Sequence, residues 1–113
     1  MIKIYHNPRC SKSRQGLKLV ENSGKPFEIV KYLDGTLSAK ALKDIVNLLG
    51  IKPIDLVRKN EAVWKSNYKG KTLTDTEVID AMVKNPKLIE RPIVINDNKA
   101  VIGRPPELIT AIL

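Results

Sequence analysis

The feature that most constrains the fold is a strand–helix–strand pattern in the first third of the chain. Residues 2–5 are short, apolar and β-prone, and residues 27–32 have the same character. Between them, residues 11–21 have helical character, with Leu17 and Val20 three apart on one face. Two strands joined by a helix form a right-handed parallel unit in nearly all known sheets. We therefore expect an α/β protein that begins with a parallel βαβ unit.

The middle of the chain carries signals for helices. Ser38 is a good N-cap for a helix that Gly50 ends, and Thr74 opens a capping box with Glu77. Shorter helical turns are expected at 53–58 and at 60–65. Together these signals predict an all-helical insertion at about residues 36–86.

The last third of the chain returns to the strand period. Residues 93–95 and 100–102 are β-prone and flank a polar turn, which indicates a hairpin. Pro105 is then placed to open a final helix. A parallel pair followed by a hairpin and a terminal helix is the thioredoxin-like topology. We expect one domain over residues 1–113, with a mixed sheet of about four strands.

Composition narrows the classes of partner. The chain has 113 residues, with 20 Lys and Arg against 12 Asp and Glu, which gives a net charge of +8. This balance favours an anionic partner. Aromatic residues make up only 4% and the basic residues are spread along the chain, which does not favour nucleic acid.

The sequence also bears on location. No apolar run approaches the roughly 18 residues of a membrane span, and the first residues are too short an apolar stretch for a signal peptide. The chain has one cysteine, which excludes an internal disulfide and a cysteine-rich zinc site. With one histidine as well, we expect no bound metal, and a cytoplasmic location where thiols stay reduced.

Cys10 is the leading candidate for chemistry. It lies just after the first expected strand and just before the first expected helix, where backbone N–H groups and the helix dipole favour an anion. Lys12 and Arg14 add positive charge, so the pKa of the thiol should be lowered. The alternative is that Cys10 is simply a small buried apolar residue.

The neighbours of Cys10 limit the type of thiol chemistry. A dithiol motif would need a second cysteine at position 13, where Ser13 stands, so Cys10 needs an external thiol to resolve its oxidised form. Gly16 excludes a phosphatase loop of the C-x5-R type. The Ser13 hydroxyl could donate a hydrogen bond to the thiolate, and His6 could act as a proton acceptor or stabilising charge. An exposed His6 without a role is the alternative.

Three later arginines are candidates for holding an oxyanion. Arg58 ends a short expected helix, Arg91 precedes Pro92, and Arg104 precedes Pro105-Pro106. Paired guanidinium N–H donors suit a tetrahedral oxyanion in a way that lysine cannot copy. The alternative is that all three are ordinary solvated surface arginines.

Four segments together resemble a known family. They are His6–Arg14, Arg58–Asn60, Glu90–Val94 and Gly103–Glu107, in the same order and at similar spacing. In these segments the chain resembles the glutaredoxin-coupled arsenate reductases, and most of all their shorter, chromosomally encoded branch.

The resemblance implies an activity in arsenic detoxification and a set of roles. A Cys10 thiolate would attack arsenate or a similar oxyanion, glutathione would act as co-substrate, and glutaredoxin would reduce the resulting mixed disulfide. No bound cofactor and no membrane are implied. The residues that it assigns are an oxyanion clamp of Arg58, Arg91 and Arg104, thiolate support from His6, Ser13 and Arg14, and a cis-proline at Pro92.

Two other functions stay open at this point. One is a monothiol reductase that resolves glutathione mixed disulfides with the same Cys10 but without the three arginines. The other is an RNA-polymerase-binding regulator of the same superfamily, although Ser13 removes the Cys-x-x-Cys switch with which such regulators sense oxidants.

Overall fold

The computed structural model describes residues 1–35 and 37–113. These residues divide into two compact units. We call Met1–Tyr32 with Arg91–Leu113 the sheet unit, and Leu33–Glu90 the helical unit. The expected insertion at about 36–86 falls within the helical unit, and its first position lies outside the described residues.

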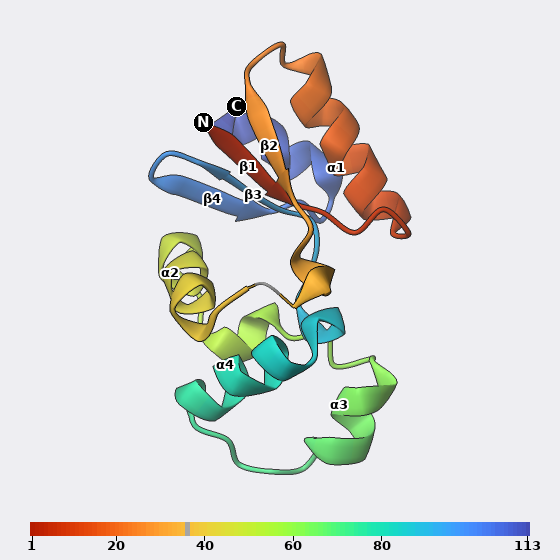
Figure 1. Cartoon of the computed structure of the whole chain (residues 1–113), viewed down its shortest axis with the longest axis vertical. Helices are drawn as coiled ribbons and strands as arrows, with labels where there is room; N and C mark the ends of the chain where they lie inside the picture. Colours follow the sequence, from red (N-terminus) through yellow and green to blue (C-terminus); the bar gives the residue numbers. More distant parts are fainter. Residues whose placement is uncertain (36) are drawn as a thin grey trace. The chain divides into compact units, whose positions relative to one another are not determined.

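The sheet unit is built on a mixed sheet (Figure 1). Within the described residues, four strands form it in the order β2-β1-β3-β4. β1 pairs parallel with β2, while the β1–β3 and β3–β4 pairs are antiparallel. This arrangement confirms the thioredoxin-like expectation. The strand bounds are β1 Ile2–Tyr5, β2 Phe27–Val30, β3 Ile93–Asn96 and β4 Lys99–Ile102.

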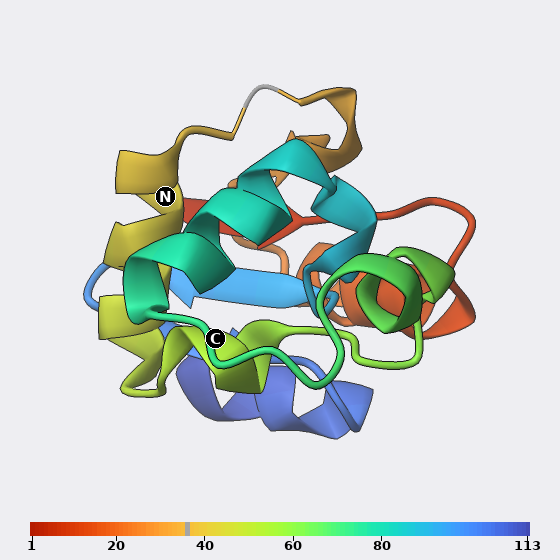
Figure 2. The same ribbon diagram turned by 90° about the horizontal axis from the view of Figure 1, so that it is seen from below.

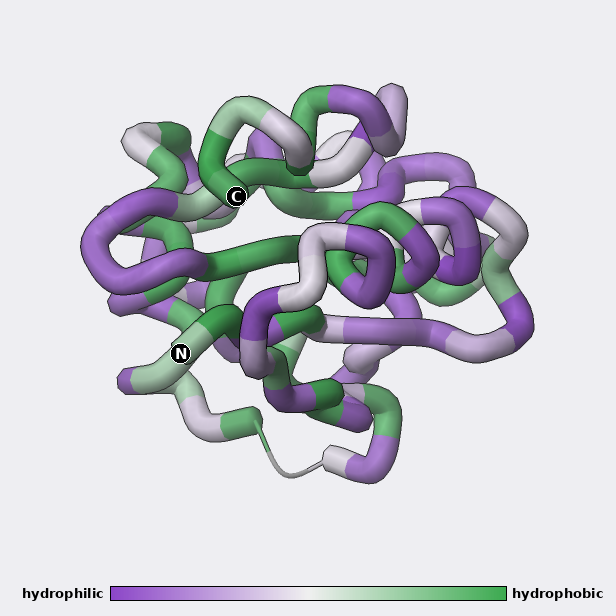
Figure 3. Tube along the Cα trace, turned by 90° about the horizontal axis from the view of Figure 1, so that it is seen from above, coloured by the Kyte–Doolittle hydropathy of each residue, from purple (hydrophilic) through white to green (hydrophobic). Residues whose placement is uncertain are grey.

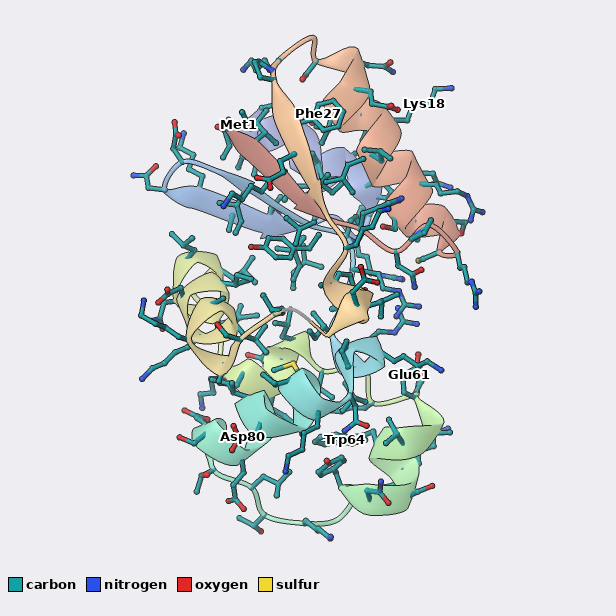
Figure 4. The ribbon with its side chains drawn as sticks, viewed as in Figure 1. Met1, Lys18, Phe27, Glu61, Trp64 and Asp80 are labelled. Atoms are coloured by element: carbon teal, nitrogen blue, oxygen red, sulfur yellow. The ribbon has the colours of Figure 1, made fainter. Side chains whose placement is uncertain are left out.

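One face of this sheet is covered by α1 (Ser11–Asn22) and the 3-10 helix η4 (Pro106–Ile112), which contact each other. Alternation along β1 places Ile2 and Ile4 on that face. The turn between β3 and β4, at the far left of Figure 3, is coloured hydrophilic. The buried cluster consists of Ile2, Ile4, Val20, Val94 and Ile109, and the partly buried Phe27, labelled in Figure 4, packs against it.

Two elements of the sheet unit differ from the sequence expectation. The second strand ends at Val30, because β1 ends at Tyr5 and the ladder closes with the His6 N–H donating to the Val30 carbonyl at 3.1 Å. Tyr32 lies instead in the 3-10 turn η1 (Tyr32–Asp34). The last helix is a 3-10 helix that begins at Pro106, since Pro105 is extended with ψ 159°.

The helical unit contains α2 (Ala39–Leu49), α3 (Ala62–Asn67) and α4 (Asp75–Lys84), as Figure 2 shows from below. α2 and α4 lie side by side and contact each other. The expected ends are confirmed. Ser38 accepts from the Ala41 N–H, Gly50 is left-handed with φ 68°, and Thr74 forms a capping box with Glu77.

The shorter helical turns are shifted from their expected places. The turn expected at 53–58 is the 3-10 helix η2 (Pro53–Leu56), because Val57 forms a β-bridge with Ile89 and leaves the helical path. The turn expected at 60–65 is α3, where Trp64 stacks on Tyr68 with ring centroids 5.3 Å apart. No helix in residues 1–35 or 37–113 is both long enough and apolar enough to cross a membrane.

Candidate active site

A tight loop brings the chain from β1 to α1 and presents Cys10. The Asn7 side-chain oxygen accepts from the Arg9 N–H at 3.0 Å, and the Asn7 carbonyl accepts from the Cys10 N–H at 3.0 Å. These two bonds form the type of turn that an Asn-Pro pair favours. Cys10 is the N-cap of α1, with φ −96° and ψ 124°, and is partly exposed. Its sulfur therefore lies where the helix N–H groups are unsatisfied.

Several donors converge on the Cys10 sulfur. Burial is the largest influence and raises the pKa of the thiol. The pKa of Cys10 is nevertheless lowered overall, because three neighbours outweigh the effect of burial. These neighbours are the Ser13 N–H, Arg91 through its hydrogen bond and its charge, and the Lys12 N–H. The Arg104 Nη2 also donates to the sulfur at 3.5 Å. A thiol in this setting is poised to be an anion.

Arg91 and Arg104 come from the open end of the β3–β4 hairpin. Arg91 comes two residues before β3, and Arg104 follows β4 by two residues. The two segments are joined by a bond from the Gly103 N–H to the Pro92 carbonyl and one from the Arg104 Nε to the Arg91 carbonyl, each 2.8 Å long. Both arginines precede a proline in a cis peptide bond, Pro92 and Pro105. The hairpin thus holds two guanidinium groups near one sulfur.

A buried polar network supports the first turn of α1. His6, Asn7 and Ser13 are at most 8% exposed. The Ser13 Oγ accepts from the Asn7 N–H at 2.9 Å and lies 2.7 Å from the His6 Nδ1. Burial is the main cause of the lowered pKa of His6, so the neutral imidazole can accept a hydrogen bond from the Ser13 hydroxyl at Nδ1. Ser13 therefore acts on the sulfur through its backbone N–H, and its hydroxyl is turned to His6 instead of the thiolate position considered above.

Arg14 acts on the loop. Its Nη1 donates to the Pro8 carbonyl at 2.9 Å, and the side chain is exposed. Its positive charge also helps to lower the pKa of His6, after burial. Arg14 therefore stabilises the loop that precedes Cys10.

Arg58 belongs to the helical unit. Its Nε lies 3.5 Å from the Glu61 Oε1, and its Nη1 lies 3.4 Å from the Glu90 Oε1. The side chain is 22% exposed. Its backbone is fixed by the Arg58 N–H donating to the Leu88 carbonyl at 2.7 Å. The geometry near the sulfur thus involves Arg91 and Arg104, and the assignment of Arg58 stays a prediction.

The sheet unit can stabilise negative charge at and beside the sulfur. A thiolate, two guanidinium groups and helix N–H donors suit nucleophilic attack on a tetrahedral oxyanion. Asn7 was missed as a functional residue, although the Asn-Pro pair is a known turn signal. Gly103 was also missed, and its contacts depend on segments that are distant in sequence, so no local pattern could reveal them.

Comparison with known proteins gives several close relatives. An uncharacterised Escherichia coli protein, YfgD, is 46% identical over 114 residues, covering 99% of this chain and 96% of the relative. An arsenate reductase of Haemophilus influenzae is 45% identical over 112 residues, covering 97% of each chain. The solved structure of an arsenate reductase from Vibrio cholerae has a TM-score of 0.93 at 42% identity, covering 99% of this chain and 97% of that one.

The family model agrees with the relatives. The model described as the ArsC family matches residues 5–112, which include the loop before Cys10, both hairpin arginines and the whole helical unit. The resemblance seen in four short segments is therefore confirmed over nearly the full length, and this chain belongs to the ArsC family.

Proposed function

We propose that this protein reduces arsenate to arsenite, with the Cys10 thiolate as nucleophile. The observation that carries the proposal is the convergence of donors on that sulfur: Arg91 and the N–H groups of Ser13 and Lys12 lower its pKa against the effect of burial, and the Arg104 Nη2 lies 3.5 Å from it. Relatives named arsenate reductase at 43–45% identity support the choice of oxyanion. A reducing cytoplasm is the location that suits a single active thiol.

The first step is attack on arsenate. The Cys10 sulfur forms a bond to arsenic, and the bond from arsenic to a hydroxyl group of arsenate breaks, with that hydroxyl taking one proton and leaving as water. Arsenic stays in the +5 state in this step. Arsenate is an anion near neutral pH and repels a bare thiolate, so the guanidinium groups of Arg91 and Arg104 offset that repulsion and stabilise the charge on the oxygens.

The second step supplies the electrons. Cys10 is the only cysteine of the chain, so a second thiol must come from outside. A glutathione thiolate attacks the Cys10 sulfur, a disulfide forms, and the sulfur–arsenic bond breaks with its electron pair passing to arsenic. Arsenite leaves in the +3 state. A glutaredoxin thiolate then attacks the glutathione sulfur and releases the Cys10 thiolate.

The remaining residues have supporting roles in this proposal. His6 and Asn7 hold the Ser13 hydroxyl, and with it the first turn of α1 that donates to the sulfur. Arg14 holds the Pro8 carbonyl of the same loop. Arg58 is assigned to the oxyanion clamp by the family resemblance, and it would have to share its guanidinium with Glu61 and Glu90.

A second candidate function uses the same sulfur. Cys10 could resolve glutathione mixed disulfides, since a partly exposed thiol of lowered pKa is all that this exchange needs. That reaction has no tetrahedral dianion, so it leaves Arg91 and Arg104 without a substrate to hold. The arrangement therefore favours the oxyanion reaction.

The test is an arsenite-formation assay with defined donors. Purified protein is given arsenate with glutathione and glutaredoxin together, with each alone, and with thioredoxin in their place. We expect arsenite only when glutathione and glutaredoxin are both present. Arsenite formed equally well with thioredoxin would refute the donor assignment and leave the oxyanion assignment standing.

The same preparation distinguishes the two candidate functions. A glutathione-mixed disulfide of a small thiol is offered in place of arsenate, under the same donor conditions. Fast reduction of that disulfide, together with no arsenite from any donor mixture, would reject arsenate reduction and select the disulfide reductase.

A further inference from the structure

Gly16 and Gly103 of the sheet unit lie so close to the buried side chains of Pro92 and Ile109 that a Cβ at either glycine would clash with them. At Gly16, an added Cβ would lie 2.8 Å from the Pro92 Cγ and 2.9 Å from the Ile109 Cδ1. At Gly103, it would lie 2.7 Å from the Ile109 Cδ1 and 2.9 Å from the Pro92 Cγ. Carbon atoms prefer about 3.5–4.0 Å. Pro92 and Ile109 are fully buried, and the Pro92 Cγ belongs to a rigid ring, so an added methyl group has to displace the Ile109 side chain or the backbone of these segments.

These contacts connect the elements that carry the reactive groups. Gly16 lies on the buried face of α1, the helix that Cys10 caps. Gly103 directly precedes Arg104, and Pro92 directly follows Arg91. The segments of Cys10 and Arg104 therefore contact Pro92 and Ile109 through their glycines, and Pro92 belongs to the segment of Arg91.

We infer that Gly16 and Gly103 are positioning residues. Because they carry no side chain, α1 and the Arg104 segment close onto Pro92 and Ile109, and this contact sets the distance between the Cys10 sulfur and the guanidinium groups. The inference rests on the proposed use of Cys10, and it adds two residues that touch neither the sulfur nor a substrate.

The distance matters because the attraction between charges falls as they separate. Near 4 Å, a further ångström removes about a fifth of a charge–charge interaction, and a hydrogen bond to sulfur weakens more steeply. A methyl group at either glycine should therefore raise the pKa of Cys10. The groups that act on the sulfur or on its loop are Arg91 before β3, Arg104 after β4, the N–H groups of Lys12 and Ser13 in α1, His6 through the Ser13 hydroxyl, and Arg14 through the Pro8 carbonyl.

The chain offers a matched control for loss of stability. Gly24 follows the end of α1 with φ +71°, and a Cβ added there would meet nothing within 4 Å. Gly24→Ala therefore strains the backbone without adding a contact. Gly16→Ala should by contrast stabilise the backbone of α1, because alanine is about 1 kcal/mol more favourable than glycine inside a helix. Any defect at position 16 must then come from the contact with Pro92 and Ile109.

The experiment measures the alkylation of Cys10 by iodoacetamide slightly below neutral pH, with a thermal melt of each variant. Gly103→Ala and Gly16→Ala should react about three to ten times more slowly than the natural chain. Gly24→Ala should melt earlier but react at the natural rate. Ile109→Val removes the Cδ1 atom nearest to Gly103, so Gly103→Ala/Ile109→Val should recover part of the lost rate.

Natural alkylation rates in folded Gly103→Ala and Gly16→Ala would overturn the inference, and so would an equal slowing in Gly24→Ala. If Gly103→Ala does not fold, Gly16→Ala and the double variant decide the matter by the same criterion. The readout needs no arsenate. A chain that forms no arsenite but shows these alkylation differences would reject the proposed substrate and keep the positioning role.

Discussion

The sheet unit and the helical unit bury different kinds of side chain. In the described part of the sheet unit, the buried polar residues are His6, Asn7 and Ser13, all within four residues of Cys10. The helical unit buries apolar side chains such as Leu42, Leu56 and Met82, all fully buried. Burying polar groups costs free energy unless each is hydrogen-bonded. The sheet unit bears that cost at one place, beside the thiol that we propose as the nucleophile.

The contrast extends to the arginines. In the sheet unit, the Arg104 Nε donates to the Arg91 carbonyl and the Arg104 Nη2 donates to the Cys10 sulfur. In the helical unit, Arg58 is held by the carboxylates of Glu61 and Glu90. The guanidinium of Arg58 lies between two carboxylates that offset its charge, whereas one donor of Arg104 is directed at the Cys10 sulfur.

The largest expected effect is at the sulfur itself. Cys10→Ser should reduce arsenite formation by about a thousandfold or more, because a serine hydroxyl is not ionised near neutral pH and no second thiol exists in the chain. The fold should persist, as judged by circular dichroism. Appreciable arsenite formation by the folded variant would contradict the mechanism.

The next effect concerns stability in the helical unit. Leu42 is fully buried on α2, and Leu42→Ala should lower the free energy of unfolding by about 2–5 kcal/mol in urea titrations. Leu48→Ala, on the same helix but 40% exposed, is the matched control and should cost less than about 1 kcal/mol. The pH profile of Cys10 alkylation should be unchanged in both. A shifted alkylation profile in folded Leu42→Ala would show that the helical unit also influences Cys10, and would contradict the assignment of that influence to the sheet unit alone.

The third effect tests the oxyanion clamp. Arg104→Lys keeps the charge but loses the paired donors, so it should cost about 2–4 kcal/mol of transition-state stabilisation. That loss is roughly 30- to 1000-fold in kcat/KM for arsenate. Arg91→Lys should behave similarly, and Arg9→Lys, an exposed neighbour of Cys10, is the control that should be nearly silent.

The corresponding change at Arg58 sharpens the comparison. A loss in Arg58→Lys as large as that in Arg104→Lys would place Arg58 in the clamp in spite of its carboxylate partners. A loss of stability without a specific loss for arsenate would assign it to its ion pairs with Glu61 and Glu90.

The smallest effect is an acid sensitivity from His6. Burial lowers the pKa of His6, so the unfolded chain takes up its proton at higher pH than the folded chain does. Stability should therefore fall as the pH drops below about 6.5, the ordinary value for histidine. In a Cys10→Ser background, which removes the thiol titration, His6→Asn should show a flatter dependence of unfolding free energy on pH. An unchanged slope would mean that His6 titrates as an ordinary exposed histidine.

Local signals predicted much of the fold. Ser38, Gly50 and Thr74 mark helix ends through bonds made within one turn, and the structure has those ends. The strands of the sheet were predicted from short runs of β-prone residues, and the hairpin also from the polar turn between its strands. The end of β2 was missed because it depends on where β1 stops, which is a property of a different segment.

The site was predictable to a similar degree. The position of Cys10 before a helix was visible in the sequence, and so was the pairing of an arginine with a following proline at two places. The bond from the Arg104 Nε to the Arg91 carbonyl, and the close contacts of Gly16 and Gly103, join residues that are far apart in the chain. Such contacts exist only after the hairpin and α1 have packed.

The most direct test of the central claim is the pH dependence of Cys10 alkylation in the natural chain. The same chain unfolded in urea supplies the reference, since its thiol should titrate near the ordinary value of about 8.5. The folded chain should reach its full rate at clearly lower pH than the unfolded chain, because Ser13, Arg91 and Lys12 favour the thiolate more than burial disfavours it. Coincident profiles for the folded and unfolded chains would show an ordinary thiol, and the account of Cys10 as a nucleophile would be wrong.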